Sequence, residues 1–465
     1  TGLHVIRGLS SNGVAATVRS YFRNQIDSLY TSSGISSTIW GIYSQVGATI
    51  VMTGNKIHSL FPGQSATAGA FAKGIALLPS ASGTSIKVYN NVVSLDLSQA
   101  FAPAANNVLT GANSVIGVDV APSGAATLSI YYNTVRLAGG GSGTTFGSSG
   151  ISHSNNNGTI DLRNNLVANQ MTPGGGVGSF AVALRRNQAV MTGFAATSNN
   201  NLFYTTETAT TPLYYNGTAG FATLAAYQGN VTPRDTLSID DLPVFVSTAT
   251  NDLHLNPGSN CGIDGSAQPI ATYLDDYDAT NTRDLNAPDI GFDEFDGTGG
   301  STVWKGINTN WFDPKNWCGV VPTASSDVTI PKRFSGKYPI ILTGTNALTR
   351  NITINQYASV TINTNGKMTN AGVWLNNGTL TNNGTIELNG TVNQLFPNVA
   401  STGTLSAMTN LTTNNAAGVT IDKNLTLYGI LKPKAGAITL NNITVTLHSD
   451  LSSTASVDTL VGGTS

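Results

Sequence analysis

The acidic residues of this sequence are concentrated in one segment, and that segment is the first candidate for a metal site. Eight of its 24 acidic side chains lie in the 22 residues from 275 to 296. Four positions there carry oxygen ligands at a spacing typical of calcium loops: Asp275, Asp276, Asp278 and Asn281. The central glycine and final glutamate of an EF-hand are missing. Pairing of Arg283 with Asp284 or Asp289 would instead fasten the end of a domain. We favour that interpretation and keep calcium as a hypothesis.

Three of the five tryptophans lie within 14 residues, at Trp304, Trp311 and Trp317. Aromatic rings grouped at a surface stack on sugar rings, so one hypothesis is a glycan-binding platform. The other is burial, because the first coil of a repeat domain needs bulky side chains to close its core. We favour burial and retain the three residues as candidate ligand-binding positions.

The two cysteines, Cys261 and Cys318, lie outside any C-x-x-C motif, and no histidine stands at a zinc-site spacing from them. A zinc site at these cysteines is therefore not expected. Two hypotheses stay open. One is a pair of buried free thiols, and the other is a disulfide bond, which an extracellular habitat would favour.

Charged residues make up only 10% of the 465 residues, and the formal net charge is −2. Nucleic-acid binding and attachment to anionic membrane surfaces both depend on clustered lysine and arginine, so this composition argues against them. No apolar run reaches about 18 residues, the length that a membrane-spanning helix needs. The chain begins at Thr1 without a signal peptide, and we expect a processed or excised piece.

Two motifs recur in step through the first 200 residues. One is a glycine followed by an apolar residue, at Gly8, Gly41, Gly74, Gly117 and Gly150. The other is an asparagine with an apolar residue two positions later, at Asn24, Asn55, Asn91, Asn133, Asn165 and Asn201. With alternating runs such as 85–89 between them, they predict stacked coils of short strands. The asparagines are expected to form a hydrogen-bonded ladder or to serve as turn residues. Helical periodicity is nearly absent, with one turn at most in 20–30.

Residues 1–297 resemble the right-handed parallel β-helix family, the architecture of pectate-lyase-like enzymes and many surface proteins. The closing segment 240–296 contains Asp-Leu-His-Leu at 252–255 and Pro-Asp-Ile-Gly at 288–291, as the ends of many secreted bacterial β-helix proteins do. Cys261 stands where such sequences tend to carry proline. The resemblance implies an all-β fold and a secreted or surface protein.

The resemblance implies what an active site would need: uronic-acid lyases and hydrolases with this fold carry an aspartate cluster on one sheet, with an arginine or lysine beside it. Here Asp96, Asp119 and Asp161 are isolated at different positions of the repeat. The only basic or titrating candidates are His153, expected to be a solvated loop residue, and the arginine pair at 185–186. No catalytic residue is singled out, and an enzyme is the less favoured hypothesis.

A linker occupies 298–303 by its composition, and a second domain is expected at 304–465. Its tryptophan-rich opening and Asn/Thr/Gly-rich repeat resemble a module of secreted proteins of the phylum Bacteroidota. Glycines recur every six residues, at Gly366, Gly372, Gly378, Gly384 and Gly390, each with an apolar residue two positions later. This hexad predicts a smaller β-solenoid or β-sandwich-like domain, with tight Asn-Gly hairpins left open. The pattern stops without a closing cap, so we expect truncation at the C-terminus.

Secreted proteins of that phylum are O-glycosylated at Ser or Thr between Asp and an apolar residue. Ser28, Thr236 and Thr459 fit this pattern and are candidate O-glycosylation sites.

The fold prediction is all-β: a right-handed parallel β-helix followed by a smaller β-solenoid. The favoured function is a rigid stalk or adhesin segment of a large secreted or cell-surface protein. It would contact glycans or other surface proteins, and the resemblance implies export by the type IX secretion machinery. The alternatives are a polysaccharide-binding or polysaccharide-cleaving β-helix, assisted by calcium, and a passive type IX secretion substrate. No cofactor other than that calcium ion is expected.

Overall fold

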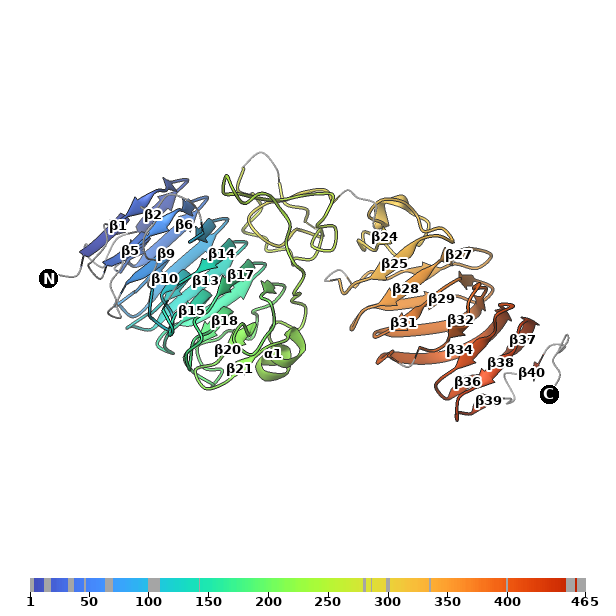
Figure 1. Ribbon diagram of the computed structural model, residues 1–465. Coiled ribbons are helices and arrows are strands. Elements are labelled where there is room, and N and C mark those ends of the chain that lie inside the picture. The colour runs from blue at the N-terminus through green and yellow to red at the C-terminus, as the bar shows by residue number, and fades with distance from the viewer. Residues whose placement is uncertain are drawn as a thin grey trace. The chain divides into compact units, whose positions relative to one another are not determined.

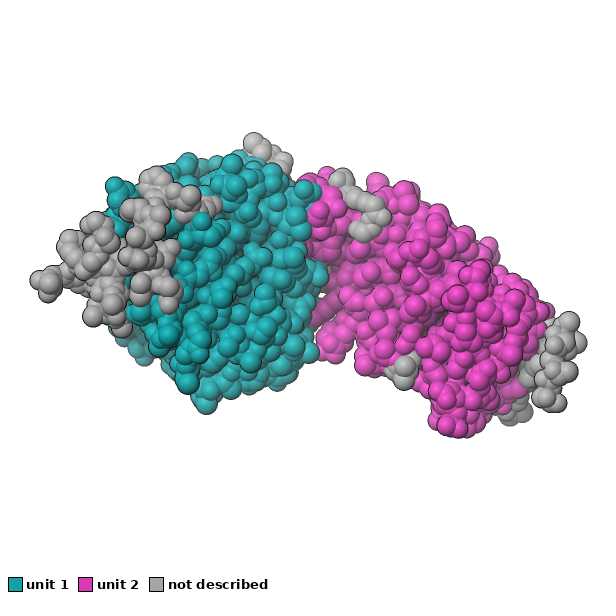
Figure 2. Space-filling model, viewed as in Figure 1, with its two compact units in different colours: residues 1–256, 266–295 teal, residues 257–265, 296–465 magenta. Residues whose placement is uncertain are grey.

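The computed structural model describes residues 4–11, 18–31, 37–45, 47–62, 70–98, 109–141, 143–278, 282–285, 287–297, 302–333, 336–398, 400–448 and 456–457. The chain forms two compact units, one of Thr1–Asn256 with Ser266–Phe295 and one of Pro257–Gly265 with Asp296–Ser465 (Figure 2). Strands in parallel sheets make up nearly all of the regular structure (Figure 1), which confirms the predicted all-β solenoid class. No helix among the described residues is long and apolar enough to cross a membrane.

Five coils of the first unit contribute one strand to each of three sheets, and the later coils contribute strands to only some of them (Figure 1). The first sheet contains β1 (His4–Ser11), β5 (Ser37–Ser44), β9 (Phe71–Leu77), β12 (Val115–Val120), β15 (Ser148–His153), β18 (Ala181–Arg186), β20 (Tyr214–Tyr215) and β21 (Gly220–Phe221). The second contains β2 (Val18–Phe22), β6 (Thr49–Thr53), β10 (Thr84–Tyr89), β13 (Ala126–Tyr131) and β16 (Thr159–Arg163). The third contains β3 (Gln25–Ile26), β7 (Lys56–His58), β11 (Val92–Asp96), β14 (Thr134–Gly140), β17 (Leu166–Thr172) and β19 (Leu202–Tyr204). A short pair, β4 (Leu29–Tyr30) and β8 (Leu60–Phe61), lies beside them. All pairs in these sheets are parallel except β20 with β21, so the unit is a parallel β-helix.

Equivalent positions of successive coils stack on one another in the core. In β10 the side chain of Ile86 is fully buried, while its neighbour Lys87 is exposed. The strand register places Ile50, Ile86, Leu128 and Ile160 in one row, and all four side chains are inaccessible to solvent. Burial of each such side chain contributes about 1.5–3 kcal/mol, so the alternating pattern of the sequence becomes a continuous apolar column.

The repeated glycines and the apolar residues after the asparagines meet in this core. A β-carbon added at Gly117 would lie 2.3 Å from Cγ1 of Val135 and 2.6 Å from the carbonyl oxygen of Gly150. The same kind of contact pairs Gly8 with Ile26, Gly41 with Ile57, Gly74 with Val93 and Gly150 with Val167. A larger residue at these positions would displace a β-branched side chain or the next strand, because close-packed interiors leave no free volume. The two sequence motifs are therefore the two halves of one packing contact.

The six predicted asparagines form a continuous ladder. Each Nδ2 donates to the next Oδ1: Asn24 to Asn55 and Asn55 to Asn91 at 2.8 Å, Asn91 to Asn133 and Asn133 to Asn165 at 2.9 Å, and Asn165 to Asn201 at 3.0 Å. Each of these Oδ1 atoms also accepts the backbone N–H of the preceding asparagine, at 2.9 to 3.1 Å. The residue with a left-handed backbone conformation comes directly before the ladder asparagine, as Asn164 with φ 60° comes before Asn165. The ladder asparagines are thus selected by their hydrogen bonds rather than by the turn.

A short helix closes the last coil. The Nδ2 of Asn201 donates to Asp235 at 2.7 Å, and the hydroxyl of Tyr227 donates to the same carboxylate. Tyr227 lies in α1 (Leu224–Val231), whose residues Tyr227 and Val231 are fully buried in the core of the coils. Residues 20–30, where the sequence allowed one helical turn at most, contain strands β2, β3 and β4 and no helix. Helix α1 is not predicted from the sequence, because only a few of its eight side chains are buried and they leave no clear helical periodicity.

The rest of the first unit returns alongside the coils. Its hairpin of β22 (Phe245–Ser247) and β23 (Asp252–Leu255) packs Leu253 against Val92 and Phe292. The carbonyl of Asp275 accepts a hydrogen bond from Asn90 at 2.6 Å, and the carbonyl of Gln268 accepts one from Asn164 at 2.8 Å. These bonds hold the closing segment against the turns that precede the ladder.

The second unit is a smaller solenoid, again of parallel strands. One sheet contains β24 (Thr302–Val303), β25 (Asp327–Ile330), β28 (Asn351–Ile354) and β31 (Trp374–Asn376), and a 3₁₀ helix spans Pro314–Asn316. The largest contains β26 (Ile340–Ile341), β27 (Asn346–Thr349), β29 (Ser359–Ile362), β30 (Lys367–Asn370), β32 (Thr379–Leu388), β34 (Thr404–Asn414), β37 (Ile430–Ala435) and β40 (Ser456–Val457). The others contain β33 (Gln394–Leu395), β35 (Val419–Ile421) and β38 (Ile438–Leu440), and β36 (Leu425–Leu427) with β39 (Val445–Leu447).

The hexad of the second unit is a subdivision of its coil. Met368 pairs with Ile386, three hexads later, and both side chains are buried. The strand pairs of this unit are parallel throughout the described residues, so Asn-Gly hairpins do not form there. Val392, expected inside by the same pattern, is 67% exposed because strand β32 ends at Leu388, before this last hexad.

The ladder predicts a large difference between an interior rung and the first one. Asn133→Ala leaves the backbone N–H and side-chain amide of Asn91 without their acceptor inside the core. We expect a loss of about 3 kcal/mol in the free energy of unfolding, since each orphaned buried group costs about 1–3 kcal/mol. Asn24→Ala, at a half-buried position with no rung before it among the described residues, should cost about 1 kcal/mol or less. Chemical denaturation measures both, and equal small losses would show that the ladder is not a source of stability.

Candidate functional site

The isolated aspartates of the coils lie on three different sheets. Asp119 is on β12 of the first sheet, Asp161 on β16 of the second and Asp96 on β11 of the third. Each is held by a cation of its own: Lys73 at 2.6 Å from Asp119, Arg163 at 2.6 Å from Asp161, and Arg136 at 2.9 Å from Asp96. A pair of carboxylates that shares general acid and base work needs both groups at one substrate. These three do not meet that condition.

His153 and the two arginines at 185–186 are structural in this arrangement. His153 lies on β15, 1% exposed, beside Arg186 of β18, so the expected solvated loop position is wrong. Burial and the charge of Arg186 lower the pKa of His153 to about 3. Arg186 donates to the carbonyls of Val190 and Thr192. Arg185 donates to the hydroxyl of Ser149 at 2.8 Å.

The tryptophan cluster is the core of the second unit's first coil. Trp304 and Trp311 are inaccessible to solvent, and Trp317 is 3% exposed. The ring of Trp317 makes edge contacts with both others, at 5.0 and 4.7 Å between centroids. The glycan-platform hypothesis for these residues is therefore corrected: their indole faces are used by one another and by the core. All three rings are buried, as the favoured interpretation predicts.

The two cysteines are joined in a disulfide bond within the second unit. Cys261 and Cys318 are both buried, with Cα atoms 6.1 Å apart. Arg333 donates to the carbonyls of Asp264 and Trp304 at 2.7 and 2.6 Å, so the same short segment is also fixed by hydrogen bonds. Residues 257–265 therefore belong to the second unit, although the sequence analysis places them in the first domain.

The acidic segment is organised around Arg283, which is 2% exposed. Its guanidinium lies 3.9 Å from the ring centroid of Tyr132 and 3.4 Å from the carboxylate of Glu294. It also donates to the side chain of Asn90 at 3.0 Å. The predicted partner Asp289 accepts from Arg283 through its backbone carbonyl. Burial raises the pKa of Glu294 to about 7, against the opposing hydrogen bonds and the arginine charge.

The candidate calcium ligands are distributed differently from a calcium loop. Asp275 is exposed and Asp276 is buried, while Asn281 lies outside the described residues. Among the described residues, Asp278 belongs to a group with His254 and Asp293 that could hold a metal ion, and Asp275 and Asp276 do not. The predicted calcium loop, with ligands at alternate residues from Asp275 to Asn281, is therefore wrong for Asp275 and Asp276. The Asp-Leu-His sequence of β23 is the signal for this group, because alternate residues of a strand put a carboxylate and an imidazole on one face.

The candidate O-glycosylation positions differ in accessibility. Ser28 is exposed, whereas Thr236 is half-buried next to Asp235, whose side chain closes the ladder. Thr459 lies outside the described residues. Glycosylation at these positions stays a prediction.

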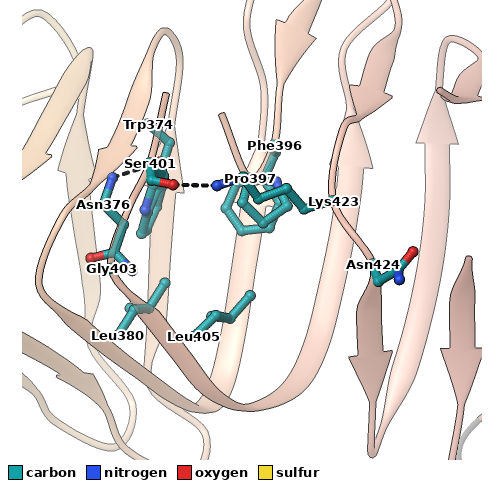
Figure 3. Close-up of a pocket in the computed structure, with 10 residues that line it drawn as sticks. All are labelled: Trp374, Asn376, Leu380, Phe396, Pro397, Ser401, Gly403, Leu405, Lys423 and Asn424. Atoms are coloured by element: carbon teal, nitrogen blue, oxygen red, sulfur yellow. Dashed lines mark hydrogen bonds between the residues drawn. The ribbon is translucent and has the colours of Figure 1, made fainter. Parts of the chain in front are cut away.

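A small pocket opens in the second unit between β31 and the strands that follow it (Figure 3). Trp374, Leu380, Phe396 and Leu405 give it an apolar lining, and Lys423 donates to the carbonyl of Ser401 at its edge. Its volume is about 70 Å³, well below the roughly 300–1,000 Å³ of typical small-molecule sites. A sugar ring is therefore too large for it.

The disulfide predicts a redox-dependent stability of the second unit. The bond closes a loop of 57 residues, and loop-closure entropy of that length is worth up to about 4 kcal/mol. Four of the five tryptophans lie in this unit, so tryptophan fluorescence should report an earlier unfolding transition after reduction or after Cys261→Ser with Cys318→Ser. The first unit provides the control, because its transition should not move. An unchanged fluorescence transition after complete reduction would contradict the prediction.

His153 predicts a specific loss of stability in acid. A histidine whose pKa is lowered by folding contributes fully above its unfolded pKa of about 6.5 and loses that contribution as the pH falls, because only the unfolded chain then takes up the proton. With a folded pKa of about 3, this residue should remove about 2–3 kcal/mol of stability between pH 7 and pH 4.5. His153→Gln should flatten the pH dependence by that amount in matched denaturation curves. Parallel curves for both proteins would refute the assignment.

Residues 303–427 match the model of a family described as a domain of unknown function (DUF8693). No curated protein and no solved structure matches the chain. The second unit is thus similar to that family over its tryptophan core and its hexad coils.

Proposed function

We propose that this chain is a rigid, adhesive segment of a larger secreted or cell-surface protein. The observation that carries the proposal is how the coils use their polar side chains. The buried ladder uses the side chains of Asn55, Asn91, Asn133 and Asn165. The three coil aspartates each form an ion pair of their own. Such coils support one another along a single axis, which favours a stalk.

The disulfide bond supports the secreted part of the proposal. The bond between Cys261 and Cys318 is of the kind that persists outside the cytosol. The sequence is poor in charged residues and rich in Asn, Thr and Ser, whose side chains, where exposed, can donate hydrogen bonds to glycan hydroxyls or other proteins and accept hydrogen bonds from them. Export by the type IX machinery enters the proposal through the resemblance of the sequence.

A polysaccharide-cleaving β-helix is the second candidate, and one row of the first sheet favours it. Asp119, Ser152 and Arg185 are register partners on β12, β15 and β18, which puts an acid and an arginine near each other on one sheet. Asp119 and Arg185 are, however, 4% and 6% exposed. Burial also lowers the pKa of Arg185 to about 10. A substrate would have to uncover both, so this candidate ranks second.

A glycan array combined with a turnover assay separates the two candidates. The full chain is applied to arrayed polysaccharides, and the same polysaccharides are incubated with it and examined for new reducing ends and for unsaturated products. We expect binding without product. Turnover that disappears in Asp119→Asn would establish the enzyme instead. Silence in both assays would remove the glycan-binding half of the proposal.

A further inference from the structure

Strand β23 places a carboxylate and an imidazole on the same face. Leu253 and Leu255 are buried, so the intervening side chains of Asp252 and His254 both point away from the core. Oδ1 of Asp252 lies 2.5 Å from Nδ1 of His254. This contact orients the ring and assigns the hydrogen of the neutral imidazole to Nδ1, which leaves the lone pair on Nε2.

Two further carboxylates converge on that lone pair. Nε2 of His254 and one oxygen each of Asp278 and Asp293 all lie within 4.8 Å of one another, and Nε2 is 3.5 Å from Oδ2 of Asp278. Nε2 is buried and makes no hydrogen bond to any residue that the structure describes. The three atoms are acceptors when the imidazole is neutral, so the group attracts a cation.

Asp293 contributes the most deeply buried side chain of the group. Asp293 is 7% exposed, and one of its carboxylate oxygens lies within 4.8 Å of the ligand atoms of His254 and Asp278. A buried carboxylate is costly unless hydrogen bonds or a positive charge compensate it. This carboxylate lies next to His254, where such a charge would bind.

We propose that His254, Asp278 and Asp293 bind a first-row transition-metal dication such as Zn²⁺, with Asp252 as the outer carboxylate that positions the imidazole. Imidazole nitrogen favours zinc and its neighbours, whereas calcium and magnesium favour oxygen-only sites. Two ligands at about 2.1 Å from a tetrahedral Zn²⁺ lie about 3.4 Å apart, close to the 3.5 Å between His254 and Asp278. The side chains of His254 and Asp278 are 32% and 43% exposed, so a water molecule has access to a fourth position.

The metal would join three separate stretches of the closing segment. His254 comes from the hairpin, Asp278 from the loop after it, and Asp293 from the stretch that packs Phe292 against Leu253 and Val92. The ring of Phe292 lies 4.9 Å from that of His254, so the site is backed by this small apolar cluster. Metal binding would therefore hold the closing segment on the coils and would stabilise the first unit by mass action.

Isothermal titration calorimetry of the tag-free, metal-stripped full chain tests the proposal with Zn²⁺ and Ca²⁺ as probes. We expect one Zn²⁺ site, with Ca²⁺ bound at least tenfold more weakly. Asp278→Asn and His254→Gln should each weaken Zn²⁺ binding at least tenfold. Asp252→Asn keeps all three ligands and should weaken it by about tenfold. Asp275→Asn, an exposed acid three residues from Asp278, is the matched control and should bind within twofold of the natural chain.

The thermal midpoint of the first unit provides a second readout. Zn²⁺ should raise it in the natural chain and in Asp275→Asn, and should leave it unchanged in Asp278→Asn. Asp278 is exposed, so this variant keeps the test decisive if His254→Gln fails to fold. Three results would each overturn the proposal: no Zn²⁺ binding by the natural chain, equal binding by Asp278→Asn, or tighter binding of Ca²⁺ than of Zn²⁺.

Discussion

A column of buried amides decides how the coils of this chain align. The side chains of Asn55, Asn91, Asn133 and Asn165 are out of contact with water, so their donors and acceptors must be satisfied within the protein. An amide supplies a donor and an acceptor at once, and each rung meets the needs of its neighbours only when the coils are in register. A slip of one residue would break a side-chain bond and a backbone bond at each rung. The same slip would also turn the apolar face of each strand away from the core, so the ladder and the apolar stacking select one register.

The glycine column adds a constraint across the coil. Val135 follows Asn133 by two residues, and it occupies the space that a side chain at Gly117 would need. The ladder therefore fixes the position of a β-branched residue, and that residue decides that only glycine fits on the first sheet opposite it. Asparagine, apolar residue and glycine form one unit of packing, which explains why the two sequence motifs keep step even where the loops between them change length.

Features that repeat at the coil period are predictable from the sequence, and features that occur once are not. The strands, the stacked core and the ladder all leave a mark at each coil. Helix α1 leaves almost none, because it occurs once and only a few of its side chains enter the core. Burial of Trp304, Trp311 and Trp317 can be favoured but not decided, since exposure is a property of the packed coil. His254 lies 24 and 39 residues before Asp278 and Asp293, and irregular chain brings the three together.

The distribution of charge follows from the same distinction. In the coils, a residue lies directly beside its equivalents in the coils before and after it, so a repeated charge would face like charges on both sides. Asp119, for example, has Ala76 and Ser152 as its register neighbours, and its cation comes from a different row. The closing segment has no equivalent to stack upon. Carboxylates can gather there because Arg283 and a backbone N–H group compensate the charge of Glu294, and the proposed metal site lies where Asp278 and Asp293 meet His254.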